Sequence, residues 1–307
     1  MTHDEIEKLA SKFVVDAANN GTPNRRVQEV TLRIMADLFK TIEDLDLSAS
    51  EVWKGIEYFS RAGAANELGL LAAGLGLERF LDIRADEAEA RAGLVGGTPR
   101  TIEGPLYVSG APESIGYARL DDGTDDHRGE VLIMHGVVFG GDGKPLSGAK
   151  VEVWHANVLG GYSFFDPSQQ PFNLRRTIIT DENGRYRFRS IVPMGYGCPP
   201  EGTTQEFLNL LGRHGRRPAH IHFFVSGNLH RTLTTQINID GDNYLWDDFA
   251  FASREGLVPP IVRVEDRARM REAGVDRPFA EIEFDFRLLT ETAGAPPAEV
   301  DRKRVSA

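Results

Sequence analysis

The chain has 307 residues, and its hydrophobic and charged contents of 41% and 26% are typical of a globular protein with a substantial core. A net charge of −11 argues against nucleic acid or an anionic membrane surface as a partner, because both require a basic footprint. No apolar run approaches the roughly 20 residues that span a bilayer. The single cysteine excludes an intrachain disulfide and fits a reducing compartment, so we expect a cytoplasmic protein.

The first ninety or so residues predict helices. Apolar residues recur at helical spacing in 6–17 and again in 27–42. Ser48 and Glu51 have the spacing of a capping box that opens a third helix. The run 67–82 is apolar with interspersed glycine, and we expect it to be helical too. These helices are expected either to pack on another domain or subunit, or to form an ordinary helical bundle.

From about residue 98, short strand patterns separated by turn signals replace the helical ones, as in 131–156, 180–190, 219–225, 232–239 and 279–288. Such a series with few intervening helices indicates a β-sandwich or barrel. The predicted fold is therefore mixed and mainly β, with a helical domain at 1–97 and a β-sandwich domain at 98–290. The Pro- and charge-rich segment 291–307 is expected to extend over the surface as a tail.

Two histidines stand two residues apart in the apolar run 217–225. In a strand, His220 and His222 share one face, while Ile221, Phe223 and Val225 share the other. Ring nitrogens at this spacing can converge on one metal ion, and imidazole suits zinc, copper, iron and nickel. On the spacing alone, two separately hydrogen-bonded core histidines are the favoured interpretation. Carboxylates are plentiful, so an iron(II) site of two histidines and one carboxylate stays open at this point.

Two tyrosines occupy loops that follow predicted strands, where scaffolds often place functional groups. These are Tyr162 in "LGGYSFFDP" and Tyr196 in the Gly/Pro-rich "VPMGYGCPP". Phenolate is a hard anionic donor, so two phenolates with two imidazoles would favour iron(III). For either tyrosine alone, a packed aromatic residue with a satisfied hydroxyl is the favoured interpretation. Cys198 is expected to be a packed small residue, and His155, His214 and His230 are expected to be structural.

Six runs, in order, resemble the intradiol ring-cleaving dioxygenases and within them the catechol 1,2-dioxygenase group: 96–108, 149–157, 162–167, 180–202, 210–226 and 233–252. The resemblance covers nearly the whole β half, and the helical N-terminal part is similar too. It implies cleavage of catechol by O₂ to cis,cis-muconate at a non-haem Fe(III), one per subunit, in aromatic degradation. It also implies a homodimer joined through N-terminal helices, with phospholipid at the dimer interface.

The resemblance assigns roles to particular residues. It implies that Tyr162, Tyr196, His220 and His222 bind the iron, with hydroxide as a fifth ligand, and that a displaced Tyr196 accepts a substrate proton. Catalytic roles fall on Arg217, which would stabilise charge on the ring, and on Gln236, which would orient a ligand or Arg217. Substrate-pocket positions fall on Leu70, Ala73, Ile102, Pro105, Leu106, Arg217, Phe249 and Ala250.

The sequence differs from the family pattern at Ala73, where many relatives carry proline. This difference leaves the choice among catechol substrates undecided. A chlorocatechol or hydroxyquinol 1,2-dioxygenase is therefore the alternative enzyme. A non-catalytic β-sandwich binding module is the remote alternative, and it would not need the two tyrosines, two histidines, arginine and glutamine together.

Overall fold

The computed structural model describes residues 1–17, 21–123, 128–293, 295, 297 and 304–306. Two compact units are formed, Met1–Ala64 and Ala65–Ala307. The second unit therefore contains part of the predicted helical domain together with the predicted sandwich. The division into domains 1–97 and 98–290 and a tail 291–307 stays a prediction. Among the described residues, no helix has the length and apolar content needed to cross a bilayer.

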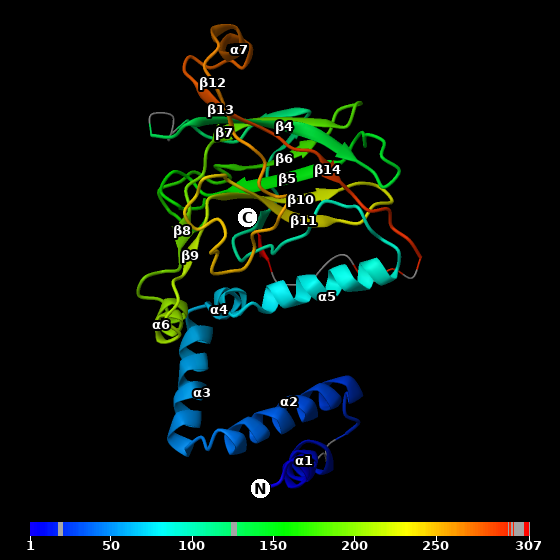
Figure 1. The fold of residues 1–307 in the computed structure, drawn as a ribbon, viewed down its shortest axis with the longest axis vertical. Coiled ribbons are helices and arrows are strands. Elements are labelled where there is room, and N and C mark those ends of the chain that lie inside the picture. Colours follow the sequence, from blue (N-terminus) through cyan, green and yellow to red (C-terminus); the bar gives the residue numbers. More distant parts are fainter. Residues whose placement is uncertain (18–20, 124–127, 294, 296, 298–303, 307) are drawn as a thin grey trace. The chain divides into compact units, whose positions relative to one another are not determined.

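The first unit is helical and comprises α1 His3–Ser11, a π-helical segment Lys12–Asp16, α2 Arg25–Asp44 and α3 Ala49–Ala64 (Figure 1). The predicted capping box is confirmed, because the Glu51 N–H donates to Ser48 Oγ at 3.3 Å and the Ser48 N–H donates to a Glu51 carboxylate oxygen at 2.9 Å. Helices α1 and α2 pack together, but many large apolar side chains of α2 and α3 stay exposed. The unit therefore has little core of its own.

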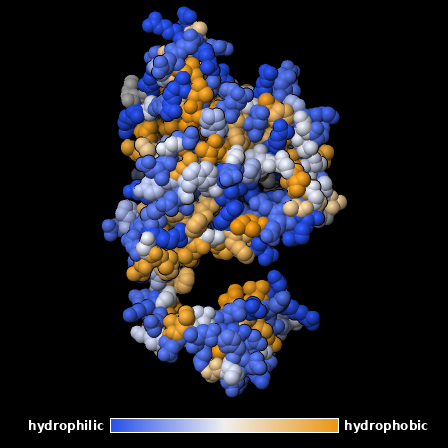
Figure 2. All heavy atoms as spheres, in the orientation of Figure 1, coloured by the Kyte–Doolittle hydropathy of each residue, from blue (hydrophilic) through white to orange (hydrophobic). Residues whose placement is uncertain are grey.

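The second unit begins with α4 Leu68–Gly74 and α5 Leu77–Arg91, and also contains α6 Thr203–Leu210 and α7 Arg267–Glu272. The apolar run 67–82 is thus two helices, because Gly76 adopts a left-handed φ of 77° that an α-helix cannot continue through. Apolar side chains reach the surface here as well, including Leu77 and Phe80. Figure 2 shows apolar side chains at the surface over α2 and over α4 and α5.

The strands belong mainly to two stacked sheets (Figure 1). Their bounds are β1 Val108–Ser109, β2 Glu113–Ile115, β3 Tyr117–Arg119, β4 Val131–Phe139, β5 Lys150–His155, β6 Arg175–Ile179, β7 Arg185–Ile191, β8 Tyr196–Gly197, β9 Arg216–Arg217, β10 His220–Ser226, β11 Leu233–Asn238, β12 Val262–Val264, β13 Phe279–Glu283, β14 Phe286–Arg287 and β15 Val305–Ser306. One sheet has the order β11-β10-β5-β6-β2. The other has the order β12-β13-β4-β7-β3, with β14 also pairing with β4.

The main core lies between these sheets, so the predicted mixed, mainly β sandwich is confirmed. Strand β10 is an interior strand between β5 and β11. Its residues Ile221, Phe223 and Val225 are buried in this core, as their alternation predicted. The two histidines of β10 therefore point to the opposite face of their sheet. Most of the predicted tail lies outside the described residues, and its β15 pairs in parallel with β1.

Candidate metal centre

The two histidines of β10 present their ring nitrogens to each other. Their Nε2 atoms are 3.0 Å apart, and both side chains are buried. The His220 Nδ1–H donates to the Pro218 carbonyl at 2.6 Å, so Nε2 carries the lone pair of the ring and turns it toward His222 and the site. Two nitrogens that each lie about 2.1 Å from one ion, roughly at right angles, would be separated by about this distance.

Both imidazoles are held in the neutral form that binds metal ions. Burial and the nearby Arg217 lower the pKa of His220 to about 3, and burial and His220 lower the pKa of His222 well below its usual value. His222 is also fixed in orientation. It stacks face to face on Trp154, its partner on β5, with ring centroids 5.0 Å apart and an interplanar angle of 5°.

The two tyrosines meet the histidines from outside the main sheets. Tyr162 lies in the loop after β5, while Tyr196 starts β8. Their rings meet edge to face, with ring centroids 5.5 Å apart. The Tyr196 hydroxyl is 3.5 Å from His220 Nε2. The Tyr162 hydroxyl is buried without a hydrogen-bond partner in the described part of the protein. Burial, reinforced by Tyr196, raises the pKa of Tyr162 well above its usual value.

This donor set fits a ferric ion. Two neutral imidazoles and two phenols converge, and one phenol oxygen is an orphaned buried polar atom of the kind a bound cation would satisfy. Among the described residues, no group of three or more His, Cys, Asp and Glu side chains is arranged so that it could hold a metal ion. An iron(II) site of two histidines and one carboxylate, which the sequence left open, therefore has no counterpart in the described structure. Hard phenolate donors favour iron(III) over zinc or iron(II).

Arg217 enters the centre through the short β8–β9 ladder, which pairs it with Tyr196. Its Nη1 is 3.5 Å from the Tyr196 hydroxyl and donates to His220 Nε2 at 3.0 Å. Its Nη2 donates to Gln236 Oε1 at 2.9 Å, so the predicted contact between these two residues is present. Gln236 also lies opposite His222 in the β10–β11 register. The guanidinium therefore faces both a tyrosine and a histidine of the centre.

Asp248 is a site residue that the sequence reasoning missed. Its carboxylate accepts from Arg217 Nε at 3.2 Å and from Nη2 at 3.1 Å, and both side chains are buried. Burial opposes both charges, but their mutual attraction prevails. It raises the pKa of Arg217 and lowers the pKa of Asp248. The residue lies in the run 233–252, but no local spacing connects a loop aspartate to an arginine 31 positions earlier.

The structure does not bring all the expected substrate-pocket residues together. Leu70, Ala73, Ile102, Phe249 and Ala250 pack together with Cys198 in one apolar cluster. Leu106 instead packs in the aromatic cluster that contains Tyr162, and Pro105 is exposed. Arg217 lies at the centre itself, as described above.

His155, His214, His230 and Cys198 lie outside the candidate centre. His155 bonds to the Ala156 carbonyl and to Ser190, His214 pairs with Asp247, and His230 bonds to the Asn228 carbonyl. Burial raises the pKa of Cys198 to about 12, which keeps it a neutral thiol. These contacts agree with the structural roles expected from the sequence.

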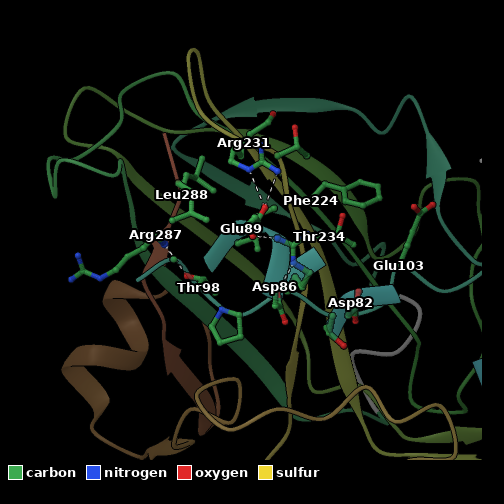
Figure 3. Close-up of a pocket in the computed structure, with 18 of the residues that line it drawn as sticks. Asp82, Asp86, Glu89, Thr98, Glu103, Phe224, Arg231, Thr234, Arg287 and Leu288 are labelled. Carbon is green, nitrogen blue, oxygen red and sulfur yellow. Dashed lines mark hydrogen bonds and ion pairs between the residues drawn. The ribbon is translucent and has the colours of Figure 1, made fainter. Parts of the chain in front are cut away.

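A cavity of about 610 Å³ lies elsewhere, and residues of α5 and of strands β5, β10 and β11 line it (Figure 3). It contains none of the four candidate ligands, and many of its charged side chains are already paired. Arg231 contacts Glu89 at 2.8 Å, and Arg304 contacts Glu103 at 3.0 Å. The size of a cavity therefore does not identify the candidate site. The converging phenols and imidazoles identify it.

Comparison with known proteins agrees with this geometry. A family model described as "Dioxygenase" matches residues 102–290, and one described as "Catechol dioxygenase N terminus" matches residues 24–93. The chain therefore belongs to the intradiol ring-cleaving dioxygenase family, as its motifs predicted.

Within that family, its near relatives are catechol 1,2-dioxygenases. Catechol 1,2-dioxygenase 2 of Acinetobacter lwoffii is 62% identical, over 89% of this chain and 98% of the relative. Catechol 1,2-dioxygenase of Acinetobacter guillouiae is 55% identical, over 96% of this chain and 97% of the relative. The crystal structure of wild-type Acinetobacter radioresistens catechol 1,2-dioxygenase superposes with a TM-score of 0.97 at 58% identity, covering 100% of this chain and 99% of that one. A hydroxyquinol 1,2-dioxygenase from a Rhizobium strain is more distant, at 32% identity over 92% of this chain and 95% of the relative.

Proposed function

We propose that this protein is a catechol 1,2-dioxygenase, which uses O₂ to open catechol between its two hydroxylated carbons and forms cis,cis-muconate. The observation that carries the proposal is the convergence of two neutral imidazoles, two phenols and a buried guanidinium in one site. Identities of 55–62% to catechol 1,2-dioxygenases, against 32% to a hydroxyquinol enzyme, support catechol as the substrate.

Tyr162, Tyr196, His220 and His222 would hold a ferric ion. When bound, this ion would act as a Lewis acid that orients catechol and draws electron density from its ring, which activates the substrate for reaction with O₂. His220 and His222 are anchored on an interior strand, and Tyr162 is 3% exposed. They are therefore suited to remain fixed.

Tyr196 is suited to leave and take a proton. It is only partly buried, and its hydroxyl lies 3.5 Å from Arg217 Nη1, which would stabilise a displaced phenolate until it accepts a catechol proton. The same guanidinium, held by Gln236 and Asp248, is positioned to stabilise negative charge that develops on the ring. The apolar cluster around Ala73 and Phe249 would pack against a flat aromatic substrate.

Turnover of a panel of catechols tests the substrate assignment. Catechol, 4-chlorocatechol and hydroxyquinol are supplied separately with O₂ consumption and the ring-opened product measured. The proposal predicts the highest kcat/KM for catechol, with one O₂ consumed per cis,cis-muconate formed. A higher kcat/KM for hydroxyquinol or chlorocatechol would favour the alternative enzyme, and no turnover of any would favour the binding module.

The iron-ligand assignment has its own test. Tyr162→Phe removes one phenol oxygen, so the protein should retain less iron, and its tyrosinate-to-iron charge-transfer band should shift or bleach. Tyr117→Phe is the control, because Tyr117 is exposed on β3. An unchanged spectrum and iron content in Tyr162→Phe would remove this residue from the ligand set.

We also propose that two copies associate through the N-terminal helices and that phospholipid binds at that interface. The exposed apolar side chains of α2, α3 and α5 support this, since such faces are usually covered in solution. A cytoplasmic location is likewise proposed, from the single cysteine. Lipid extraction followed by mass spectrometry tests the bound lipid, and its absence from freshly purified protein would contradict that part.

A further inference from the structure

Arg175 is a buried cation that the proposed chemistry has not used. It starts β6, and only 2% of its surface is exposed. The hydrogen bonds described for its side chain both go to Ser163: Nε donates to Oγ at 2.8 Å and Nη2 donates to the carbonyl at 3.1 Å. Its Nη1 is buried without an acceptor among the described residues.

The charge of Arg175 has no carboxylate partner in the described part of the chain. A charge buried without a counter-charge costs several kcal/mol. Its guanidinium carbon is 5.8 Å from the centre of the Tyr162 ring, so a metal-bound phenolate at Tyr162 is the anion that would balance it.

The same side chain also fixes the loop that carries Tyr162. Its Nε and Nη2 groups both donate to Ser163, the residue after Tyr162. Its guanidinium carbon lies 5.9 Å from the ring centre of Phe164. Phe164 has a φ of 71°, a left-handed conformation that is uncommon for a bulky residue and persists only where its surroundings enforce it. Arg175 is therefore part of what sets the direction of the Tyr162 side chain.

Each tyrosine lies beside an arginine, but the two guanidinium groups contact different parts of the tyrosine side chains. Arg217 reaches the oxygen of Tyr196, whereas Arg175 lies against the ring of Tyr162 and makes no hydrogen bond to its oxygen. A cation at the oxygen stabilises a phenolate that has left the metal. A cation at the ring stabilises the anion and leaves its oxygen free for the metal.

We propose that Arg175 is a positioning residue for Tyr162: it fixes the loop through Ser163 and places a positive charge against the ring, so that Tyr162 stays a bound phenolate while Tyr196 is the one displaced. This inference rests on the proposed ferric centre. It predicts a specific signature, because a nearby cation lowers the energy of the phenolate electrons. Removing that cation should move the tyrosinate-to-iron charge-transfer band to longer wavelength and weaken iron binding.

Three variants of the full-length, iron-loaded protein separate charge from packing. Arg175→Gln removes the charge and keeps a hydrogen-bonding group, while Arg175→Lys keeps the charge. Arg176→Gln is the control, because Arg176 is the next residue on β6 and bonds to the backbone carbonyls of Phe172 and Arg175. The readouts are the position of the charge-transfer band and the rate of iron loss to a chelator.

We expect the band of Arg175→Gln to move to longer wavelength, with iron lost ~10–100-fold faster, as is typical when a residue supporting a metal ligand is removed. Arg175→Lys should restore the band to the wild-type position, and Arg176→Gln should change neither readout. An unshifted band in Arg175→Gln, or a band in Arg175→Lys displaced as far as that of Arg175→Gln, would overturn the proposal.

Failure of this inference is distinguishable from failure of the proposed function. If the wild-type protein binds iron without developing a charge-transfer band, the ferric tyrosinate centre is wrong and the role of Arg175 falls with it. If the wild type is coloured and the Arg175 variants match it, only the role of Arg175 is wrong. Should Arg175→Gln fail to fold, the band position of Arg175→Lys decides, because a shift in that charged variant contradicts the proposal.

Discussion

At the scale of single residues, the site depends on buried charges that lie close together. Arg217 and Asp248 are each at most 6% exposed, and Arg175 is 2% exposed. Such groups are costly to bury, so each needs a partner that offsets the cost. For Arg217 the partner is a carboxylate, and for Arg175 we infer a metal-bound phenolate.

Asp248→Asn should lower kcat by ~10–100-fold with a smaller effect on KM. The substitution removes the charge that holds Arg217 between Gln236 and the Tyr196 hydroxyl, and this contact matters most when negative charge develops on the substrate. Asp247→Asn is the matched control, since the Asp247 side chain is 79% exposed and pairs with His214. Steady-state kinetics with catechol checks the prediction, and equal kcat values for the two variants would contradict it.

At the scale of secondary-structure elements, β10 shows what the sequence could and could not predict. The alternation of its residues is a local pattern of period two, so the faces of His220 and Ile221 were predictable. Register between distant strands is not local. The stacking of His222 on Trp154, 68 positions away, depends on the β5–β10 pairing, and the contact of Arg217 with Tyr196 depends on the β8–β9 ladder.

Residues that act through contacts with distant parts of the chain were the hardest to predict. The resemblance placed Tyr162 and Tyr196, but Asp248 and Arg175 act through contacts that only the folded chain creates. Neither residue has a distinguishing spacing or composition. The break of the run 67–82 at Gly76 depends on one positive φ, which an apolar pattern does not reveal.

His155, the last residue of β5, makes the free energy of unfolding depend on pH. Burial lowers the pKa of His155 from 6.5 to about 4, so below pH 6.5 the unfolded chain binds a proton that the folded chain does not. The free energy of unfolding that depends on neutral His155 is fully present above pH 6.5. It falls by at most ~3 kcal/mol as the pH is lowered to about 4. His155→Gln should reduce the loss of unfolding free energy between pH 7 and pH 4.5 by up to that amount.

Urea unfolding at a series of pH values measures this effect. His135→Gln is the control, because the His135 side chain is 34% exposed and lies on β4. The effect of His155→Gln is measured against this loss of a histidine that is not buried. If His155→Gln follows the wild-type curve, His155 does not carry this part of the acid sensitivity.

At the scale of the whole molecule, exposed apolar helix faces predict association. Ile34 on α2 is 59% exposed, and Val27 and Leu38 are exposed on the same helix. Light scattering after size-exclusion chromatography should give twice the 33.9 kDa chain mass. Ile34→Glu should shift the protein toward monomer, because it places a charge in the proposed interface.

Arg33→Gln is the matched control for this experiment. It lowers the net charge by one, as Ile34→Glu does, but Arg33 lies on the charged side of α2 and pairs with Asp37. The control should remain a dimer. A wild-type protein that is monomeric at micromolar concentration would contradict association through these helices.

The visible spectrum of the purified protein, before and after anaerobic addition of catechol, tests the central claim most directly. The account predicts a red protein with a tyrosinate-to-iron(III) charge-transfer band. This band should change on catechol binding, because catechol would replace Tyr196 as a ligand of the ion, and admission of O₂ should then yield cis,cis-muconate. A preparation that stays colourless and inactive after iron loading, or a band that catechol leaves unchanged, would contradict it.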